Sequence, residues 1–293
     1  MKSFSVVGGD LRYIELATFL SRDKNKRVFA MGFDKNVFTA ADVKLVNSSS
    51  REENRADYII LPIPAAKDDN HVNANFYTGD IPMKSLPQLL HEGGTVFAGR
   101  MTPAHKKLFE DKGISVIDYS EREDFAVMNA VATAEGAVQI AMEETDETLS
   151  SQKILILGMG RIAKVLIKQL VGFSTDITAA ARKPQDLEWA KIFGGKGLTL
   201  SKVFENLSEY DLVFNTIPAM ILDETKLIKM KKSAVIIDLA SKPGGVDFEA
   251  AARLGIKANH ALSLPGKVAP VTSGEVIAKT IANILIERGE DYE

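Results

Sequence analysis

The chain has 293 residues, of which 45% are hydrophobic and 26% charged, a composition typical of a soluble globular protein with room for two domains. A formal net charge of −3 provides no general basic face, so we expect neither nucleic acid nor an anionic membrane as the main partner. The absence of cysteine excludes disulfides, thiolate metal sites and cysteine nucleophiles, and the four scattered histidines lack zinc-ligand spacing. The sequence shows no signal peptide and no apolar run of about 18–20 residues, so we expect a cytoplasmic protein without a bound metal.

The predicted elements occur in the same order in the two halves of the chain. Each half contains five short apolar segments separated by helical patterns, and the glycines and prolines that end these segments also match. The segments lie at 4–10, 27–34, 56–64, 93–100 and 113–121 in the first half, and at 153–160, 176–183, 210–218, 233–241 and 255–263 in the second. Apolar strands that alternate with helices indicate parallel sheets covered on both faces. We therefore predict an α/β fold of two Rossmann-like, doubly wound domains.

Two helical segments set the predicted domain boundaries. Residues 129–150 carry a long alanine-rich stripe and end in acidic residues, which predicts a connecting helix between a domain at 1–128 and a domain at 151–271. Residues 272–293 are predicted to form a C-terminal helix that begins with a capping box at Thr272–Glu275. In two-domain dehydrogenases such a last helix can pack back on the first domain.

The glycine turn of the second half has the spacing of a dinucleotide-binding motif. In a strand–turn–helix, Gly158 allows the tight turn, Gly160 allows close approach of a pyrophosphate, and Ala163 allows the helix to pack on the strand. Exposed backbone N–H groups and the helix dipole favour a phosphate at the helix start. The predicted cofactor-binding residues of this turn are Gly158, Met159, Gly160, Arg161 and Ile162.

The end of the next strand favours NADP over NAD, although NAD stays possible. An NAD site places an acidic residue there to bind the ribose 2′-hydroxyl, whereas this segment reads Ala-Ala-Ala followed by Arg182 and Lys183. A cation pair can bind a 2′-phosphate, and Arg182 is the better candidate. The other interpretation is that both are solvated surface charges.

Two later turns are predicted to lie at the nicotinamide side of the site, because they follow strands at the carboxyl edge of the sheet. The residues that we assign to this side are Thr216, Ile217, Pro218, Ala240 and Ser241. Simple turn chemistry also explains the proline and glycine in these segments.

The first half has a glycine turn of a different kind. Gly8-Gly9-Asp10 places a carboxylate where a phosphate would need to approach, so we interpret the first half as the substrate domain. A polar insertion at 65–87 has no counterpart in the second half and is either a lid or a surface excursion.

The whole set of motifs resembles the family of the dipicolinate synthase A subunit. The segments that carry the resemblance occur in the family's order over nearly the whole chain: GGDLRYIEL, FAGRMTP, NAVATAEGAV, LGMGRIAK, NTIPAMIL, DLASKPGG and LPGKVAPVTSGE. The resemblance implies an NADP-linked enzyme that oxidises dihydrodipicolinate, an intermediate of lysine biosynthesis, to dipicolinate during sporulation. It also implies a flavoprotein-like partner, the dipicolinate synthase B subunit, and a location in the mother cell. We expect an oligomer.

A substrate with two carboxylates calls for cations, and its aromatisation calls for a base. Arg12, Arg100 and Lys267 are the candidate cations, although an ordinary surface salt bridge explains each of them equally well. Asp10 is the first candidate base, with Asp34 and Asp118 as others at first-domain strand ends. His260 is interpreted as a packed histidine.

Three other functions remain as alternatives. A 2-hydroxy-acid dehydrogenase is disfavoured because its arginine position here reads Ser241-Lys242-Pro243 and no matching glutamate precedes His260. An alanine-dehydrogenase-like amino-acid dehydrogenase also uses lysine and arginine from its first domain. A non-catalytic, NADP-binding regulatory protein would have no need of the three candidate cations.

Overall fold

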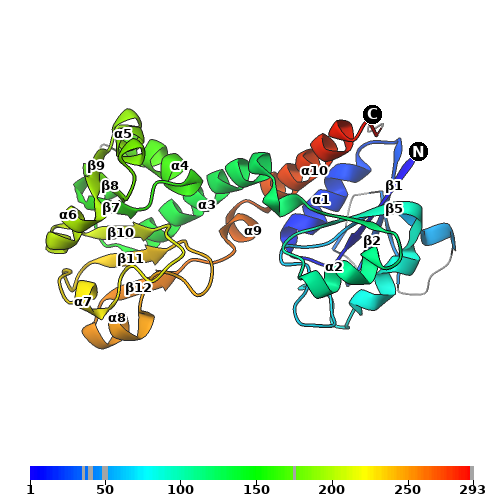
Figure 1. Cartoon of the computed structure of the whole chain (residues 1–293), viewed down its shortest axis with the longest axis horizontal. Helices are drawn as coiled ribbons and strands as arrows, with labels where there is room; N and C mark the ends of the chain where they lie inside the picture. Colours follow the sequence, from blue (N-terminus) through cyan, green and yellow to red (C-terminus); the bar gives the residue numbers. More distant parts are fainter. Residues whose placement is uncertain (35–36, 39–41, 48–51, 174–175, 291–293) are drawn as a thin grey trace. The chain divides into compact units, whose positions relative to one another are not determined.

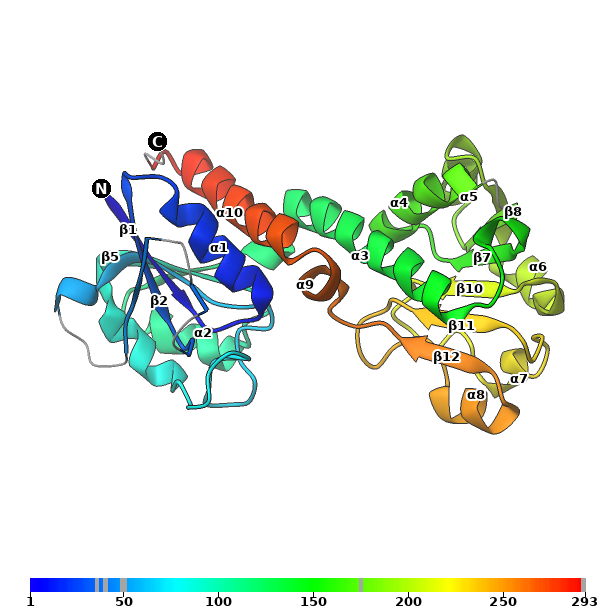
Figure 2. The same ribbon diagram turned by 180° about the vertical axis from the view of Figure 1, so that it is seen from behind.

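The structure, a computed structural model, describes residues 1–34, 37–38, 42–47, 52–173 and 176–290. The chain divides into two compact units: residues 1–128 together with 269–293, and residues 129–268. Each unit contains its own six-stranded parallel sheet with helices on both faces (Figures 1 and 2).

The sheet of the first unit has the strand order β3-β2-β1-β4-β5-β6, which is the doubly wound Rossmann order. Its strands are β1 (Lys2–Val7), β2 (Lys26–Met31), β3 (Val43–Leu45), β4 (Ala56–Ile60), β5 (Leu90–Ala98) and β6 (Ser115–Asp118). The helices α1 (Leu11–Ser21) and α10 (Pro270–Glu287) pack on one face through a core that includes Phe4, Tyr58 and Ile277. The helix α2 (Pro103–Glu110) covers the other face, where Phe109 is fully buried.

The second unit repeats this architecture with the order β9-β8-β7-β10-β11-β12. Its strands are β7 (Lys153–Leu157), β8 (Asp176–Ala181), β9 (Lys196–Thr199), β10 (Leu212–Asn215), β11 (Val235–Asp238) and β12 (Lys257–His260). One face packs on α3 (Glu123–Glu144), α4 (Arg161–Leu170) and α5 (Pro184–Ile192). The other face packs on α6 (Leu200–Glu205), α7 (Glu224–Leu227) and α8 (Phe248–Leu254), and the short helix α9 (Leu264–Val268) ends the unit.

The predicted α/β fold is therefore confirmed, and every predicted strand is present. Two strands that the sequence did not predict, β3 and β9, are edge strands of three and four residues. Their residues are exposed or half-buried, so they lack the continuous apolar pattern of the central strands.

The helix α3 differs from the predicted connecting helix at both ends. It starts at Glu123 and ends at Glu144, whereas the prediction was 129–150, and the chain passes between the two units within it. In the part of the chain that the structure describes, α3 is the one helix long and apolar enough to cross a membrane by length and composition. Half of its most apolar window is buried, and Ala134, Ala137 and Ala141 pack in the core of the second unit.

The C-terminal helix α10 lies along α1 within the first unit (Figures 1 and 2). The prediction of a capping box at Thr272–Glu275 is wrong, because α10 begins at Pro270 with Ala269 at the N-cap position. Proline at the first helical position has its φ angle already set for the helix and needs no N–H partner there. Gly274 packs so closely on α1 that an added Cβ would lie 2.6 Å from the carbonyl oxygen of Arg12.

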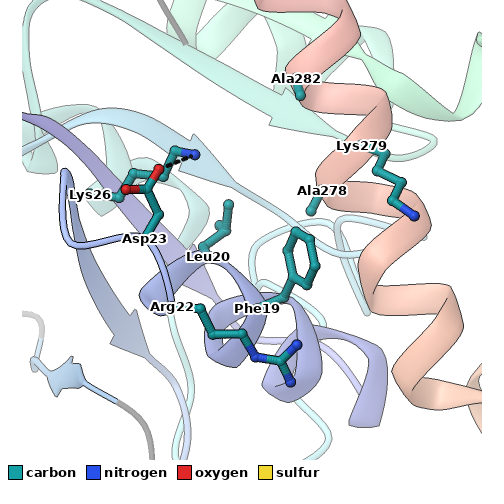
Figure 3. A pocket seen from close by; sticks show the side chains of 8 residues that line it. All are labelled: Phe19, Leu20, Arg22, Asp23, Lys26, Ala278, Lys279 and Ala282. Carbon is teal, nitrogen blue, oxygen red and sulfur yellow. Dashed lines mark ion pairs between the residues drawn. The ribbon is translucent and has the colours of Figure 1, made fainter. Parts of the chain in front are cut away.

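A groove of about 460 Å³ opens between the C-terminal half of α1 and α10 (Figure 3). Phe19, Leu20, Ala278 and Ala282 form its apolar wall, and the ion pair Asp23–Lys26 lies at one side. Because α1 starts at the carboxyl edge of the sheet and runs back to the start of β2, this groove lies at the amino edge. Ligands of doubly wound sheets bind at the opposite edge.

Candidate functional site

The carboxyl edge of the second sheet brings together all the predicted cofactor-binding turns. The strand order reverses between β7 and β10, which is the position where a dinucleotide crosses a Rossmann sheet. The strand ends are in register: Leu157 pairs with both Ala180 and Asn215, and Asn215 pairs with Asp238. The turns after β7, β8, β10 and β11 therefore begin at one level.

The glycine turn after β7 has room for a ligand at Gly160 and no room at Gly158. Gly158 has φ of +102°, and an added Cβ would lie 2.3 Å from the hydroxyl oxygen of Thr216. Gly160 is the N-cap of α4, and an added Cβ there would meet no atom of the described residues within 4 Å. Among the residues that the structure describes, no side chain caps the first turn of α4, and the turn itself contains no acidic residue. A helix start of this kind favours a bound phosphate, because its first N–H groups have no partners within the helix and its dipole is positive there.

The cations Arg182 and Lys183 lie directly after β8, and both are exposed. Within the described residues neither cation forms an ion pair. Lys183 is the N-cap residue of α5, and its side chain makes no capping hydrogen bond. Both guanidinium and ammonium groups are therefore available to an anion at the edge of the sheet.

The turns after β10 and β11 are joined through two buried polar side chains. Asn215 and Asp238 end the two strands, both are fully buried, and the Asn215 amide Nδ2 donates to Asp238 Oδ1 at 2.8 Å. Asn215 also closes the first turn, because its Oδ1 accepts from the Ile217 backbone N–H at 3.0 Å. Thr216 donates its hydroxyl to the carbonyl of Leu157 at 2.9 Å, which ties this turn to the strand before the glycine turn.

The histidine at the end of β12 has a structural contact. His260 stacks on Phe248 at 5.1 Å between ring centroids, and its Nε2 lies 3.0 Å from the carbonyl oxygen of Ala240. A carbonyl accepts only, so Nε2 carries the proton in this contact. The contact orders the turn after β11, where Ala240 is buried and Ser241 is exposed.

In the first unit the matching glycine turn is covered by the chain itself. The insertion at 65–87 crosses this turn, and the Gly9 N–H donates to the carbonyl of Asn73 at 2.8 Å. An added Cβ at Gly8 would lie 2.7 Å from the same carbonyl. Val72, Ile81 and Met83 of the insertion are buried. The insertion therefore occupies the position where a phosphate would lie in a dinucleotide domain.

The candidate catalytic residues Arg12 and Asp10 form an ion pair at the start of α1. Arg12 is buried, and its Nε and Nη2 donate to the Asp10 carboxylate at 2.9 and 2.8 Å. Asp10 is also the N-cap of α1, since its Oδ1 accepts from the Arg12 backbone N–H at 3.1 Å. Arg12 Nη2 further contacts the carbonyl oxygen of Ile63 at 3.4 Å.

A buried pair of phenols lies beside this ion pair. The hydroxyl oxygens of Tyr13 and Tyr119 are 2.5 Å apart, and Tyr119 donates to the carbonyl of Leu61 at 3.1 Å. Burial raises the pKa of Tyr13 to about 12, and burial together with the neighbouring Tyr13 raises the pKa of Tyr119 well above the ordinary value. Both phenols are therefore neutral at ordinary pH.

The remaining candidates lie in three different places. Arg100, just after β5, has φ of +52°, and its backbone N–H donates to Asp118 Oδ2 at 2.9 Å. Asp118 also caps a short 3₁₀ turn through Ser120, so its carboxylate already accepts several hydrogen bonds. Asp34 is exposed after β2, and Lys267 is exposed on α9 of the second unit.

The sequence predicted that the stretches beginning at Asn215 and Asp238 line the nicotinamide side but gave these two side chains no role, and it did not single out Tyr13 and Tyr119. The signal for the first two was present, since each is the one polar residue at the end of an otherwise apolar strand. The pairing of Tyr13 with Tyr119 joins residues 106 positions apart, and no local pattern reports such a contact.

The geometry of the second unit defines a class of protein. Residues 125–251 match the family model of the NAD-binding domain of D-isomer-specific 2-hydroxyacid dehydrogenases. Together with the open glycine turn at the switch point, this match shows that the second unit is an NAD(P)-binding domain of the dehydrogenase type. The chain is thus an oxidoreductase of the NAD(P)-dependent dehydrogenase class.

The first unit identifies the family. Residues 3–120 match the model of the N-terminal domain of the dipicolinate synthase A subunit. The chain is 30% identical to the dipicolinate synthase A subunit of Bacillus subtilis over 290 residues, covering 97% of this chain and 95% of that protein. The chain belongs to the family of the dipicolinate synthase A subunit, whose name implies a partner B subunit.

Solved structures of the same family have the same fold. The crystal structure of the dipicolinate synthase A subunit from Bacillus halodurans matches with a TM-score of 0.88 and 28% identity, covering 97% of each chain. The corresponding dipicolinate synthase structure from Bacillus subtilis matches with a TM-score of 0.86 and 28% identity, covering 98% of this chain and 96% of that one.

Proposed function

We propose that this chain is the NADP-linked part of dipicolinate synthase that oxidises dihydrodipicolinate to dipicolinate, on a branch of the lysine pathway, in the mother-cell cytoplasm of a sporulating bacterium. Membership of the family supports the reaction. The observation that carries the proposal is the carboxyl edge of the second unit, where Gly160 leaves open space at the start of α4 and the exposed Arg182 follows the neighbouring strand β8.

The preference for NADP over NAD is part of this proposal. β8 ends in Ala181 without an acidic residue, and Arg182 and Lys183 follow without ion-pair partners in the described chain. A 2′-phosphate would gain charge-assisted hydrogen bonds from these cations, each contributing about 1.5–3 kcal/mol. The same position offers no carboxylate to bind a free ribose 2′-hydroxyl.

The reaction removes two hydrogens from a dihydropyridine dicarboxylate. The substrate loses a hydride and a proton and becomes aromatic, and the bound nicotinamide supplies the hydride acceptor, so that NADPH and a proton leave with the product. The chain has to bind two carboxylates and accept the proton. We propose Arg12, Arg100 and Lys267 for the carboxylates and Asp10 for the proton. The first unit is then the substrate domain and the second the cofactor domain.

The test is a reconstitution with defined components. The purified chain is mixed with freshly generated dihydrodipicolinate and either NADP⁺ or NAD⁺, with and without the B subunit, and both dipicolinate and reduced nicotinamide are measured. We expect equal amounts of both products, formed faster with NADP⁺. Activity that needs the B subunit would make this chain the cofactor-bearing part of a two-part enzyme.

The contrary outcomes are also distinct. If the chain binds NADPH but no mixture forms dipicolinate, the proposed reaction is wrong and the NAD(P)-binding domain stands. Turnover of an amino acid by the same preparation would instead favour the amino-acid dehydrogenase alternative.

A further inference from the structure

We propose that Asn215 and Asp238 are positioning residues for the nicotinamide half of the cofactor. The sequence gave neither side chain a role, and both are fully buried at the carboxyl ends of neighbouring strands. The inference deepens the proposed function and rests on it, since it assumes that a dinucleotide binds at this edge.

Asp238 is a buried carboxylate that three N–H groups surround. Its Oδ1 accepts from the Asn215 amide at 2.8 Å and from the Ala240 backbone at 3.1 Å. Its Oδ2 accepts from the Gly245 backbone at 2.7 Å. The two backbone donors, Ala240 and Gly245, come from the two ends of the 239–245 turn, so one side chain holds the turn at its beginning and its end. In the described residues Asp238 forms no ion pair, so its desolvation is offset by these hydrogen bonds.

Asn215 extends the same network to the preceding turn. Its Nδ2 donates to the Ile217 carbonyl at 3.1 Å, and its Oδ1 accepts from the Ile217 N–H at 3.0 Å. The two N–H donors and the oxygen of the amide are thus shared between Asp238 and Ile217. The predicted nicotinamide-side residues Thr216 and Ile217 are held by this amide.

The glycines of the 239–245 turn show how closely it packs on the pair. Gly244 has φ of +92°, and an added Cβ would lie 2.7 Å from Asp238 Oδ2. An added Cβ at Gly245 would lie 2.3 Å from Asn215 Nδ2. The backbone of the 239–245 turn therefore packs directly against the side chains of Asn215 and Asp238. We expect a substitution of either residue to displace the turn.

The strand order indicates which half of the cofactor this network serves. The 2′-phosphate candidates Arg182 and Lys183 follow β8, on one side of β7, whereas Asn215 and Asp238 end β10 and β11 on the other side. A dinucleotide that crosses the switch point places its adenosine half on the β8 side and its nicotinamide half on the β10 side. Disturbing the pair should affect nicotinamide binding and leave adenosine binding intact.

The experiment compares two probes on one variant. Asp238→Asn keeps the shape of the side chain but turns an amide N–H₂ toward the Gly245 N–H, donor against donor. Binding of NADPH and of adenosine 2′,5′-bisphosphate, which lacks nicotinamide, is measured by calorimetry, and bound NADPH fluorescence reports the surroundings of the ring. We expect NADPH affinity to fall at least tenfold and its fluorescence change to be lost, while the bisphosphate binds within twofold of the unmodified chain.

Asp247→Asn is the matched control. This carboxylate lies nine residues further on and caps α8 by accepting from the Ala250 N–H at 2.9 Å. Asparagine caps a helix start about as well as aspartate, so this variant should leave both the stability and the binding of the two probes nearly unchanged. If Asp238→Asn fails to fold, Asn215→Ala takes its place, because it removes one of three donors and leaves the Asp238 bonds to the backbone.

The outcomes separate the inference from the proposed function. Asp238→Asn that binds NADPH with unchanged affinity and fluorescence overturns the positioning role. An equal loss of both probes also overturns it, because the network would then support the whole unit and not one half of the site. If the unmodified chain binds neither probe, the cofactor assignment itself is wrong.

Discussion

Arg12 and Asp10 neutralise each other at the start of α1, with the guanidinium and carboxylate joined by hydrogen bonds of 2.9 and 2.8 Å. The sequence offered these residues as separate candidates, a substrate-binding cation and a base. Their pairing means that a substrate carboxylate that contacts Arg12 contacts a group whose charge is already compensated. Removing Arg12 therefore affects the fold as well as any substrate.

The first prediction concerns this pair. Arg12→Ala should lower the free energy of unfolding by about 2–4 kcal/mol, because it leaves a partly buried carboxylate without its partner. Urea denaturation measures the loss, and a double-mutant cycle with Asp10→Asn should show coupling of the two sites. The control is Arg22→Ala, an exposed arginine after the same helix, with an expected change within about 0.5 kcal/mol. An Arg12→Ala chain of unchanged stability would contradict a structural role.

The second prediction separates the two glycines of the cofactor turn. Gly160→Ala should change the free energy of unfolding by no more than about 0.5–1 kcal/mol, because φ is −78° and the added methyl group meets no described atom within 4 Å. The same methyl group should abolish NADPH binding, because it would occupy the space of the pyrophosphate. Gly158→Ala should destabilise the second unit, because φ is +102° and the methyl would overlap Thr216. Thermal unfolding with and without NADPH measures both effects. Retained NADPH binding in Gly160→Ala would show that the pyrophosphate lies elsewhere.

The third prediction concerns cofactor choice. Arg182→Ala should raise KM for NADP⁺ about 10–100-fold, the loss of one charge-assisted contact of about 1.5–3 kcal/mol, and should leave KM for NAD⁺ unchanged. Lys191→Ala is the control, because this exposed lysine on α5 pairs with Glu188. A parallel increase of both KM values would place Arg182 outside the 2′-phosphate site.

The fourth prediction concerns alkaline pH. Tyr13 in the folded state has a pKa of about 12, above the value of about 10 expected in the unfolded chain. The stability that this group contributes is therefore fully present below pH 10 and is lost as pH rises toward 12. Ultraviolet titration should show the buried phenols ionising only at high pH or on unfolding, and Tyr119→Phe should remove one late-titrating group. Ionisation of all tyrosines near pH 10 in the folded chain would refute the buried pair.

The fifth prediction concerns the contact of α10 with α1. Gly274→Ala should destabilise the first unit by about 1–3 kcal/mol, because the methyl would lie 2.6 Å from the Arg12 carbonyl and 2.8 Å from the Leu16 nitrogen, and backbone atoms cannot move aside. Thr272→Ala should change stability by less than about 0.5 kcal/mol, because Thr272 is exposed and does not cap the helix. A larger loss of stability in Thr272→Ala would indicate that Thr272 caps the helix after all.

Much of the candidate cofactor site could be predicted from the sequence, because the residues proposed for it are set by local patterns. Gly158, Gly160 and Arg182 each follow an apolar strand within a few residues, and in a parallel sheet all such strand ends meet at one edge. The short edge strands β3 and β9 were missed, since an exposed strand of three or four residues carries no apolar run.

The sequence by itself determined the two doubly wound domains, the open glycine turn and the absence of thiol chemistry, because strand periodicity, glycine spacing and composition are properties of neighbouring residues. Only the tertiary structure decided the remaining contacts. In the folded chain the carbonyl of Asn73 accepts a hydrogen bond from the Gly9 N–H, the hydroxyl groups of Tyr13 and Tyr119 are hydrogen-bonded, and the Asn215 amide donates to Asp238. Each of these contacts joins segments far apart in the chain, and its partner is chosen by how the layers pack and by the need to satisfy buried polar groups.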